Sequence, residues 1–411
     1  MEYYNKYFDG IFWIPNNEDD KIISTLHIDQ EGKATISSLE SFNNTEFIND
    51  LLNIDLVLGY VNCQDESKTY SIKLYNLYKS HETLGYLNKV KYTSNDVLIA
   101  KAIDKNINSE PYTSIMLNSV LIDNWVSITG FNFKKFNHEK NFEITHLYNQ
   151  PDTIQLYNDE KINIYIYFRA QSRYHNRRKS SITEEVFINI EVSELKNIEE
   201  LNKIRIIIDR LLNLILFKPF ISSVIELRTI DKINYRMIKK FNEFDSNLTK
   251  SIDFTLFKNN SQNIFSKWFK KQNKLDLAIV NFFSVFGRKG VLIENKFLTY
   301  ISILENFHKN HIKSEAYLKT RLKYLLEKSS ISQKIMDINS FADKLKITRN
   351  YHAHLEEKHK SKSLTGLEIH YSNYLLEFLI REIFLNEIGI KENLSVPPNV
   401  EKCLSIINQL K

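Results

Sequence analysis

The chain has 411 residues with a formal net charge of +5, and hydrophobic residues make up 43% of it. This composition is typical of a globular protein and excludes a disordered or fibrous one. Nine glycines and six prolines are few for this length, and neither GxGxxG nor GxxxxGK[ST] occurs. The sequence therefore argues against a Rossmann dinucleotide site and against a P-loop NTPase.

Cysteine content and hydropathy bear on the compartment. The two cysteines, Cys63 and Cys403, are too few for a disulfide framework or a four-cysteine zinc site. The first 15 residues carry Glu2 and Asp9 and lack the apolar region of a secretory signal. No apolar stretch reaches the roughly 20 residues that a bilayer crossing needs. We therefore expect a soluble, cytoplasmic protein that makes no membrane contact.

The first half of the chain alternates apolar and polar residues with period two, the pattern of strands with one buried face. The alternation is clearest at 162–168 and 186–192. Similar runs occur at 10–14, 23–28, 33–38, 55–62, 70–74 and 118–129. These runs predict an antiparallel sandwich or barrel-like β domain. The residues 199–217 change to helical spacing and predict one helix that packs on the sheets.

From about Ser261 the apolar residues recur with helical period and no strand is expected. The expected helices are 275–286, 294–308, 317–327, 340–357, 371–388 and a short one after Pro398. Short links between amphipathic helices favour an antiparallel bundle. We therefore predict an α+β protein with a β-rich domain at 1–257 and a helical domain at 261–411, joined by the polar stretch 258–263.

One helical segment carries a candidate for phosphodiester chemistry. Arg349 stands five positions before His354. A histidine can move a proton to or from a ribose hydroxyl or a leaving oxygen, and a guanidinium can neutralise charge that grows on the phosphate, so no metal or cofactor is required. The same kind of spacing occurs at Arg169 and His175, where a strand is expected to run into a polar turn. The alternative for Arg349 and His354 is an ordinary helix surface.

Helix geometry sets a condition on this pair. The expected apolar stripe of the helix is Phe341, Leu345, Thr348, His352 and Leu355, which turns His352 to the core. Arg349 lies about 140° from His354 around the axis. Either the arginine side chain curls round the helix, or a second copy of the helix supplies part of the site. A homodimer would satisfy the second case.

The residues 349–354, Arg-Asn-Tyr-His-Ala-His, resemble the motif of the HEPN superfamily, specifically of the ApeA-like HEPN proteins of bacterial anti-phage defence. The segment 297–308, with its Leu304–Glu305 pair, looks like the earlier helix of that family. The segments 10–15 and 121–125, followed by Gly130–Phe131, and Trp268 are similar to the β-rich domain that accompanies such bundles. The resemblance spans most of the chain.

The resemblance implies a metal-independent endoribonuclease that acts as a homodimer in abortive-infection defence. His354 would act as general base or acid, Arg349 would stabilise the transition state, and Asn350 would position the phosphate or the histidine. Attack by the 2′-hydroxyl would leave a 2′,3′-cyclic phosphate. The RNA would be tRNA, rRNA or mRNA, and a phage-derived trigger would act at the N-terminal domain. The rival reading is a non-catalytic RNA-binding or dimerising scaffold.

Several other residues are weaker candidates. Glu305 could orient Arg349 through a charge-assisted bond, and Tyr351 could stack on a base, although both also suit an ordinary bundle surface. The lysines after the motif and the basic cluster of the first half could guide phosphates, or could simply be solvated. These basic residues are Lys358, Lys360, Arg177, Arg178 and Lys179. His352 and His354 point to opposite helix faces, and no cysteine is near them, so we expect no metal site, although His352, Glu356 and His359 share a helix face and leave one as a minor alternative.

Overall fold

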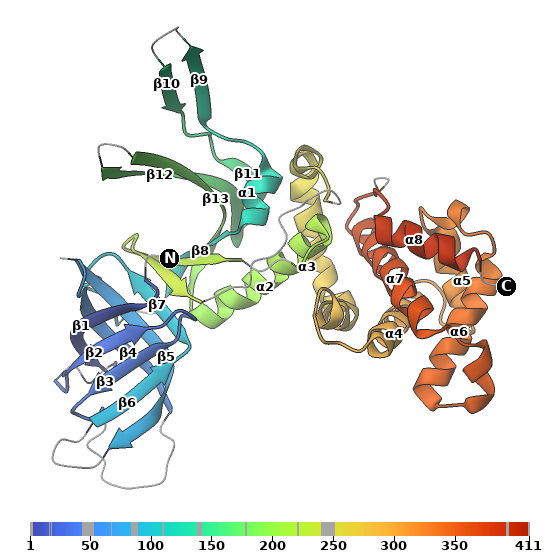
Figure 1. The fold of residues 1–411 in the computed structure, drawn as a ribbon, viewed down its shortest axis with the longest axis horizontal. Coiled ribbons are helices and arrows are strands. Elements are labelled where there is room, and N and C mark those ends of the chain that lie inside the picture. Colours follow the sequence, from blue (N-terminus) through green and yellow to red (C-terminus); the bar gives the residue numbers. More distant parts are fainter. Residues whose placement is uncertain are drawn as a thin grey trace. The chain divides into compact units, whose positions relative to one another are not determined.

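The computed structural model describes two compact units. The described residues are 3–15, 17, 19–42, 53–66, 68–83, 89–108, 111–137, 142–176, 179–219, 222–239, 251–391 and 394–409. The N-terminal unit consists of residues 1–205 and 221–245, and the helical unit consists of residues 206–220 and 246–411. The first is built from antiparallel strands and the second from helices, which confirms the predicted α+β class (Figure 1).

Six strands of the N-terminal unit close into a barrel. They are β1 (Lys6–Trp13), β2 (Ile22–Ile28), β3 (Ala34–Ser38), β4 (Asn53–Cys63), β5 (Thr69–Thr83) and β6 (Lys89–Ser94). The hydrogen-bonded order β5-β4-β1-β2-β3-β6 returns to β5 through the β5–β6 pairing. Every neighbouring pair is antiparallel. Closure leaves the barrel without a free edge between its first and last strands.

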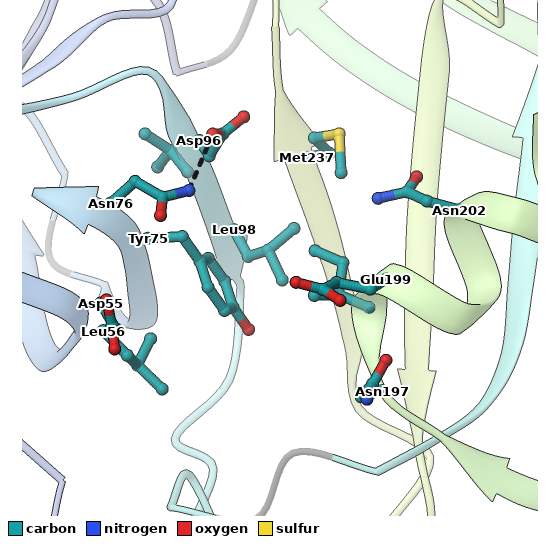
Figure 2. A pocket seen from close by; sticks show the side chains of 12 residues that line it. Asp55, Leu56, Tyr75, Asn76, Asp96, Leu98, Asn197, Glu199, Asn202 and Met237 are labelled. Atoms are coloured by element: carbon teal, nitrogen blue, oxygen red, sulfur yellow. Dashed lines mark hydrogen bonds between the residues drawn. The ribbon is translucent and has the colours of Figure 1, made fainter.

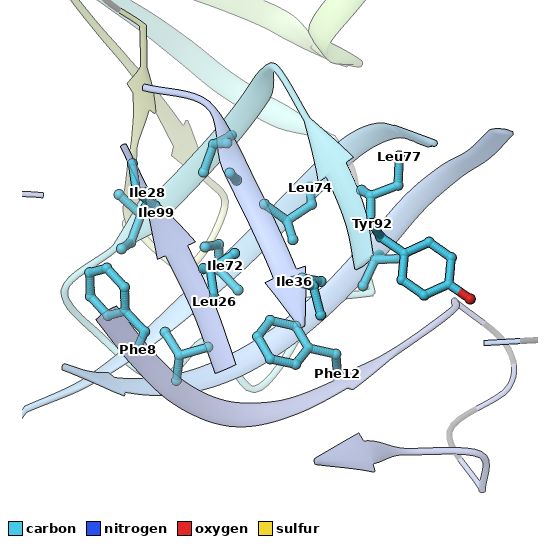
Figure 3. Close-up of a cluster of buried hydrophobic side chains, with 14 of the residues drawn as sticks. Phe8, Phe12, Leu26, Ile28, Ile36, Ile72, Leu74, Leu77, Tyr92 and Ile99 are labelled. Atoms are coloured by element: carbon cyan, nitrogen blue, oxygen red, sulfur yellow. The ribbon is translucent and has the colours of Figure 1, made fainter. Parts of the chain in front are cut away.

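The apolar residues of these strands fill the barrel. In β2, Ile22, Leu26 and Ile28 are buried, whereas Ile23, which points the other way, is 82% exposed. Phe8, Phe12, Leu26, Ile36, Ile72 and Leu74 belong to the same buried cluster (Figure 3). The period of two predicted from the sequence is therefore the period with which side chains enter and leave this core.

The remaining strands extend from β5 as an open antiparallel sheet. They are β7 (Asp96–Ala100), β8 (Tyr112–Asn118), β11 (Ile154–Asn158), β12 (Ile162–Asn176), β13 (Lys179–Lys196), β14 (Val224–Thr229) and β15 (Asn234–Ile238). Their order from β5 is β7-β15-β14-β8-β13-β12-β11, and β9 (Phe131–Asn137) and β10 (Phe142–Tyr148) form a separate hairpin. Strand β5 pairs with β7 up to Tyr75 and with β6 from Tyr78. Asn76, with φ 52°, lies at this change of partner.

The expected strand at 118–129 is wrong, because most of this segment is the short helix α1 (Val120–Val126). The hydroxyl of Ser119 caps the helix by accepting a hydrogen bond from the amide of Ile122. Ser127 ends it in the left-handed conformation. Leu121 and Trp125 are buried, so the apolar run that was interpreted as a strand is the inner face of a helix.

One carboxylate of α1 makes the stability of the protein depend on pH. Asp123 accepts hydrogen bonds from Asn118 and from the amide of Val186, yet burial raises its pKa to about 6. An unfolded aspartate titrates near 3.9, so between these values the folded chain binds more protons than the unfolded one. The contribution of Asp123 to the free energy of unfolding therefore rises as the pH falls through 6 and is lost as the pH rises.

We expect Asp123→Asn, which keeps the acceptor and removes the charge, to melt above the wild type at pH 7.5. The gain is about 1 kcal/mol once partial exposure is allowed for, and the difference should shrink at pH 5. Thermal melts of both proteins at the two pH values test this. A difference that is the same at both values would contradict the assignment.

The helical unit follows the predicted series of helices. It contains the second half of α2 (Ile198–Leu216), then α3 (Phe254–Val285), α4 (Ile293–His311), α5 (Leu318–Lys328), α6 (Ile338–His354), α7 (Gly366–Glu387) and α8 (Pro398–Ile407). The stretch 258–263 is not a linker, because it lies inside α3. Residues 206–220 also belong to this unit, so only the first part of α2 groups with the strands.

Two side chains bind the second half of α2 within the helical unit. Trp268 of α3 donates its indole N–H to the carbonyl of Ile207. Arg381 of α7 is fully buried and donates to the carbonyls of Leu214 and Ile215 over 2.7 and 3.1 Å. The carbonyls of Leu214 and Ile215 belong to the last turn of α2, where no further helical N–H group is available to them. Burial lowers the pKa of the Arg381 guanidinium to about 9.

No helix in the described ranges is both long and apolar enough to span a membrane.

Candidate active site

The end of α6 brings Arg349 and His354 together within one chain. Asp337 caps the start of the helix, and Leu355, with φ 53°, ends it directly after His354. Arg349 Nη1 lies 3.1 Å from His354 Nε2. The arginine side chain therefore spans the angular separation along the helix, and the pair forms without a second copy.

Two further polar groups hold the guanidinium. The amide oxygen of Asn350 accepts a hydrogen bond of 3.3 Å from Arg349 Nη1. From α4, Glu305 Oε2 lies 3.8 Å from Arg349 Nη2, an ion pair too long to be a direct hydrogen bond. The side chains of Arg349 and Glu305 are 32% and 33% exposed. The site is thus at the surface, within reach of a polymer.

The hydrogen-bond pattern leaves part of the guanidinium available. A guanidinium has five N–H donors and no acceptor. Within the described part of the chain, Arg349 donates hydrogen bonds only from Nη1. Its Nε and Nη2 groups can therefore face the oxygens of a phosphate, in the forked geometry that suits this anion.

The same contact limits the roles of the two side chains. Because a guanidinium can only donate, a hydrogen bond across the 3.1 Å contact requires Nε2 of His354 to accept. When this hydrogen bond opens, Nε2 can accept a proton from a substrate hydroxyl, and the freed guanidinium can face the negative charge on the reacting group.

The neighbours of the pair differ from the expected stripe. Phe341, Leu345 and Thr348 are buried as predicted, but His352 is only half-buried and Leu355 is 75% exposed, since the helix has already ended. The interpretation of Leu355 as a core residue is therefore wrong. Tyr351 is half-buried, and its ring meets that of His352 edge to face at 4.8 Å.

The expected helix to residue 357 is also too long, because α6 ends at His354 and a 3-10 helix, Glu357–Lys362, follows. Lys358 lies 2.8 Å from Glu356 and is 72% exposed, and Lys360 pairs with Glu357. The hydrogen bond from Lys358 holds the pKa of Glu356 below its usual range. No three metal-binding side chains converge among the residues that the structure describes, Glu356 and His359 included.

The second Arg–His spacing lies within a strand and not in a turn after residue 168. Strand β12 continues past Arg169 to Asn176, which corrects the expected strand-to-turn junction. Arg169 donates to Glu185 and to both oxygens of Glu226, and it stacks on Phe187 at 4.3 Å. Arg177 and Arg178 lie outside the described residues, and Lys179 is described only as the first residue of β13.

Sequence analysis did not single out Arg321, which supports the site from α5. This side chain is 6% exposed and donates to the carbonyls of Ser314 and Ala316 and to that of Glu305. It thereby fixes the end of α4 from which Glu305 faces Arg349. A signal was present in the sequence, because Arg321 interrupts the apolar stripe between Leu318 and Leu325.

Comparison with known proteins agrees with this architecture. Residues 8–269 match the model of ApeA N-terminal domain 1, and residues 277–394 match the model of the Apea-like HEPN family. No curated protein and no solved structure matches the chain. The second match contains Glu305, Arg349 and His354, and the first contains the barrel and the open sheet. The chain therefore belongs to the ApeA-like HEPN proteins.

Proposed function

We propose that the protein is a metal-independent endoribonuclease whose catalytic residues are Arg349 and His354. The observation that carries this proposal is the 3.1 Å contact between the guanidinium and the imidazole at the exposed end of α6. It joins a proton acceptor and a phosphate-binding cation in one place. Asn350 and Glu305 are positioning residues, because each contacts Arg349 and would act on the reaction through it.

In the proposed reaction, Nε2 of His354 removes the proton of a ribose 2′-hydroxyl. The 2′-oxygen then bonds to the adjacent phosphorus, and the bond from phosphorus to the 5′-oxygen of the next nucleotide breaks. The leaving oxygen takes a proton from solvent water and His354 releases its proton to solvent, which gives a 5′-hydroxyl and a 2′,3′-cyclic phosphate. Arg349 faces the phosphate oxygens and stabilises the charge that develops on them. DNA lacks the attacking hydroxyl and should resist.

The RNA path and the biological role belong to the same proposal. Tyr351, Lys358 and Lys360 lie within a few residues of His354 and would contact bases or phosphates next to the cleaved bond. Arg177, Arg178 and Lys179 are proposed as a second phosphate-binding cluster. We propose that residues 261–411 carry the nuclease in abortive-infection defence in the cytoplasm. Residues 1–257 would sense a phage-derived trigger and regulate it.

We also propose a homodimer formed through the helical unit. The contact between Arg349 and His354 removes the need for a second copy to complete the pair, so the support comes from exposed leucines. Leu292 and Leu367 are 66% and 64% exposed, and they are adjacent in sequence to Ile293 and Gly366, which approach each other. A contiguous apolar patch is typical of a surface that a partner covers, and we propose that these two leucines belong to such a patch.

Light scattering is expected to give about twice the 48.7 kDa of one chain. The double change Leu292→Glu and Leu367→Glu should reduce the mass to that of a single chain. Exchange of Leu277, which is 75% exposed on α3, for glutamate tests whether any exposed leucine has the same effect. A wild-type protein that is monomeric and fully active at the same dilution would refute the dimer.

The test of the nuclease is incubation of purified full-length protein with total tRNA and rRNA in excess EDTA. We expect discrete fragments that end in 2′,3′-cyclic phosphate and no cleavage of DNA of the same sequence. The rival function, a scaffold that only binds RNA, predicts a shift of the RNA in a gel without fragments. Fragments that disappear with EDTA would show that the proposed chemistry is wrong.

A further inference from the structure

A pocket of about 650 Å³ opens in the N-terminal unit beside the change of partner in β5. Its lining comes from β4, β5, β7 and β15 and from the beginning of α2. Figure 2 shows Tyr75 and Leu98 in the middle, between Asp55 on one side and Glu199 and Met237 on the other. The pocket thus lies where the closed barrel and the open sheet diverge.

The polar groups of the pocket are acidic or neutral. Three carboxylates line it, from Asp55, Asp96 and Glu199, together with the amides of Asn76, Asn197 and Asn202. Its twelve described lining residues include no lysine, arginine or histidine. A second pocket of the same unit, of about 440 Å³, has the opposite character, because four cations and two glutamates line it. The negative lining is therefore a property of this pocket and not of the whole unit.

These carboxylates lack a counter-ion in the described part of the chain. Neither Asp55 nor Glu199 makes an ion pair or a side-chain hydrogen bond there, and Asp96 accepts only a long one of 3.5 Å from Asn76. Like charges around one cavity repel each other, and a bound cation would relieve that repulsion. The charge alone, however, does not distinguish a metal ion from an organic cation.

The apolar lining of the pocket favours an organic cation. Leu56, Ile198 and Met237 are half-buried and offer apolar surface, and the buried Val97 and Leu98 lie behind them. Tyr75 offers an aromatic ring, over which an ammonium or guanidinium group can sit. A hydrated metal ion gains nothing from such a lining, and the three carboxylates do not converge as ligands among the described residues. An aliphatic stem that ends in a positive charge can pack on the apolar side chains of the pocket and place its charge beside the carboxylates.

We propose that this pocket binds lysine or arginine side chains of a polypeptide partner. The volume exceeds that of one such side chain, which leaves room for a neighbouring residue of the partner on the apolar lining. The pocket belongs to the N-terminal unit, whereas Arg349 and His354 belong to the helical unit. Recognition of a basic segment here is therefore independent of the proposed RNA cleavage and can be measured without it.

The test uses full-length protein and a fluorescein-labelled, blocked tetrapeptide that alternates lysine and leucine. Fluorescence anisotropy at low salt should show saturable binding, and the matching glutamate–leucine peptide should not bind. The double change Asp96→Asn and Glu199→Gln should weaken binding about tenfold, because two attractive charges are lost. Asp55→Asn, at an exposed position, gives a second and gentler variant if the double variant does not fold.

The matched control is the double change Glu160→Gln and Glu194→Gln, which removes two exposed carboxylates of the same unit outside the pocket. It should leave the affinity within about twofold of wild type, because screened surface charges contribute little. An equal loss of affinity in both double variants would show that net charge alone causes the binding and would overturn the proposal. Failure of the wild type to bind the lysine peptide, or tighter binding of spermidine than of the peptide, would also overturn it.

Discussion

Replacement of His354 by alanine should lower the rate of RNA cleavage at least a hundredfold while the protein remains folded. The ring is exposed at the last position of α6, so its loss removes the proton acceptor without opening a cavity. Arg349→Ala should have an effect of similar size. Removal of one preorganised group that stabilises developing charge costs about 3 kcal/mol, or a hundredfold to a thousandfold in rate.

Two matched variants separate chemistry from folding. His352→Ala removes the other histidine of the same turn, which is half-buried, and should lower the melting temperature more than the rate. Arg349→Lys keeps the charge but cannot reach Asn350, His354 and a phosphate at once, so an intermediate rate is expected. Cleavage at the wild-type rate by the His354 variant in a single-turnover assay would remove this residue from the mechanism.

The largest loss of stability is expected for Arg381→Ala. The change deletes a fully buried side chain and leaves the carbonyls of Leu214 and Ile215 at the end of α2 without these donors. It also removes the guanidinium that packs 4.4 Å from the ring of Phe217. A cavity and unsatisfied carbonyls together cost about 3 kcal/mol or more. Urea unfolding followed by helical circular dichroism measures this difference.

The exposed Arg288 provides the control for this experiment, since its replacement by alanine should change the free energy of unfolding by less than about 0.5 kcal/mol. Arg381→Lys retains a charge but cannot fork between two carbonyls, and should lie between wild type and the alanine variant. If Arg381→Ala unfolds within 0.5 kcal/mol of wild type, roughly the effect expected of a surface change, the hydrogen bonds to α2 do not stabilise the fold as argued.

Periodicity in the sequence identified the strands and helices whose one face is buried. The alternation at 23–28 and 162–168 and the helical stripes after residue 261 predict the α+β class, because each pattern records which side chains leave water. The spacing of Arg349 and His354 suggested the candidate site, but a similar spacing at Arg169 and His175 left the choice to the helical context and the family resemblance. Local patterns succeed here because one element determines them.

Other features depended on contacts between distant segments. Pairing of β5 with β6 closes the barrel, and Arg321 holds Glu305 from another helix, which no local pattern could indicate. The run at 120–126 is compatible with a strand or a helix, and burial of Leu121 and Trp125 under one helical face decides it. Arg349 and His354 are separated by about 140° around the helix axis, and the side chain of Arg349 spans this separation. Its guanidinium is held near His354 by hydrogen bonds to Asn350 and His354 and by the charge of Glu305. Sequence thus predicted most of the buried faces and the residues proposed for the chemistry, whereas tertiary contacts determined which of them meet.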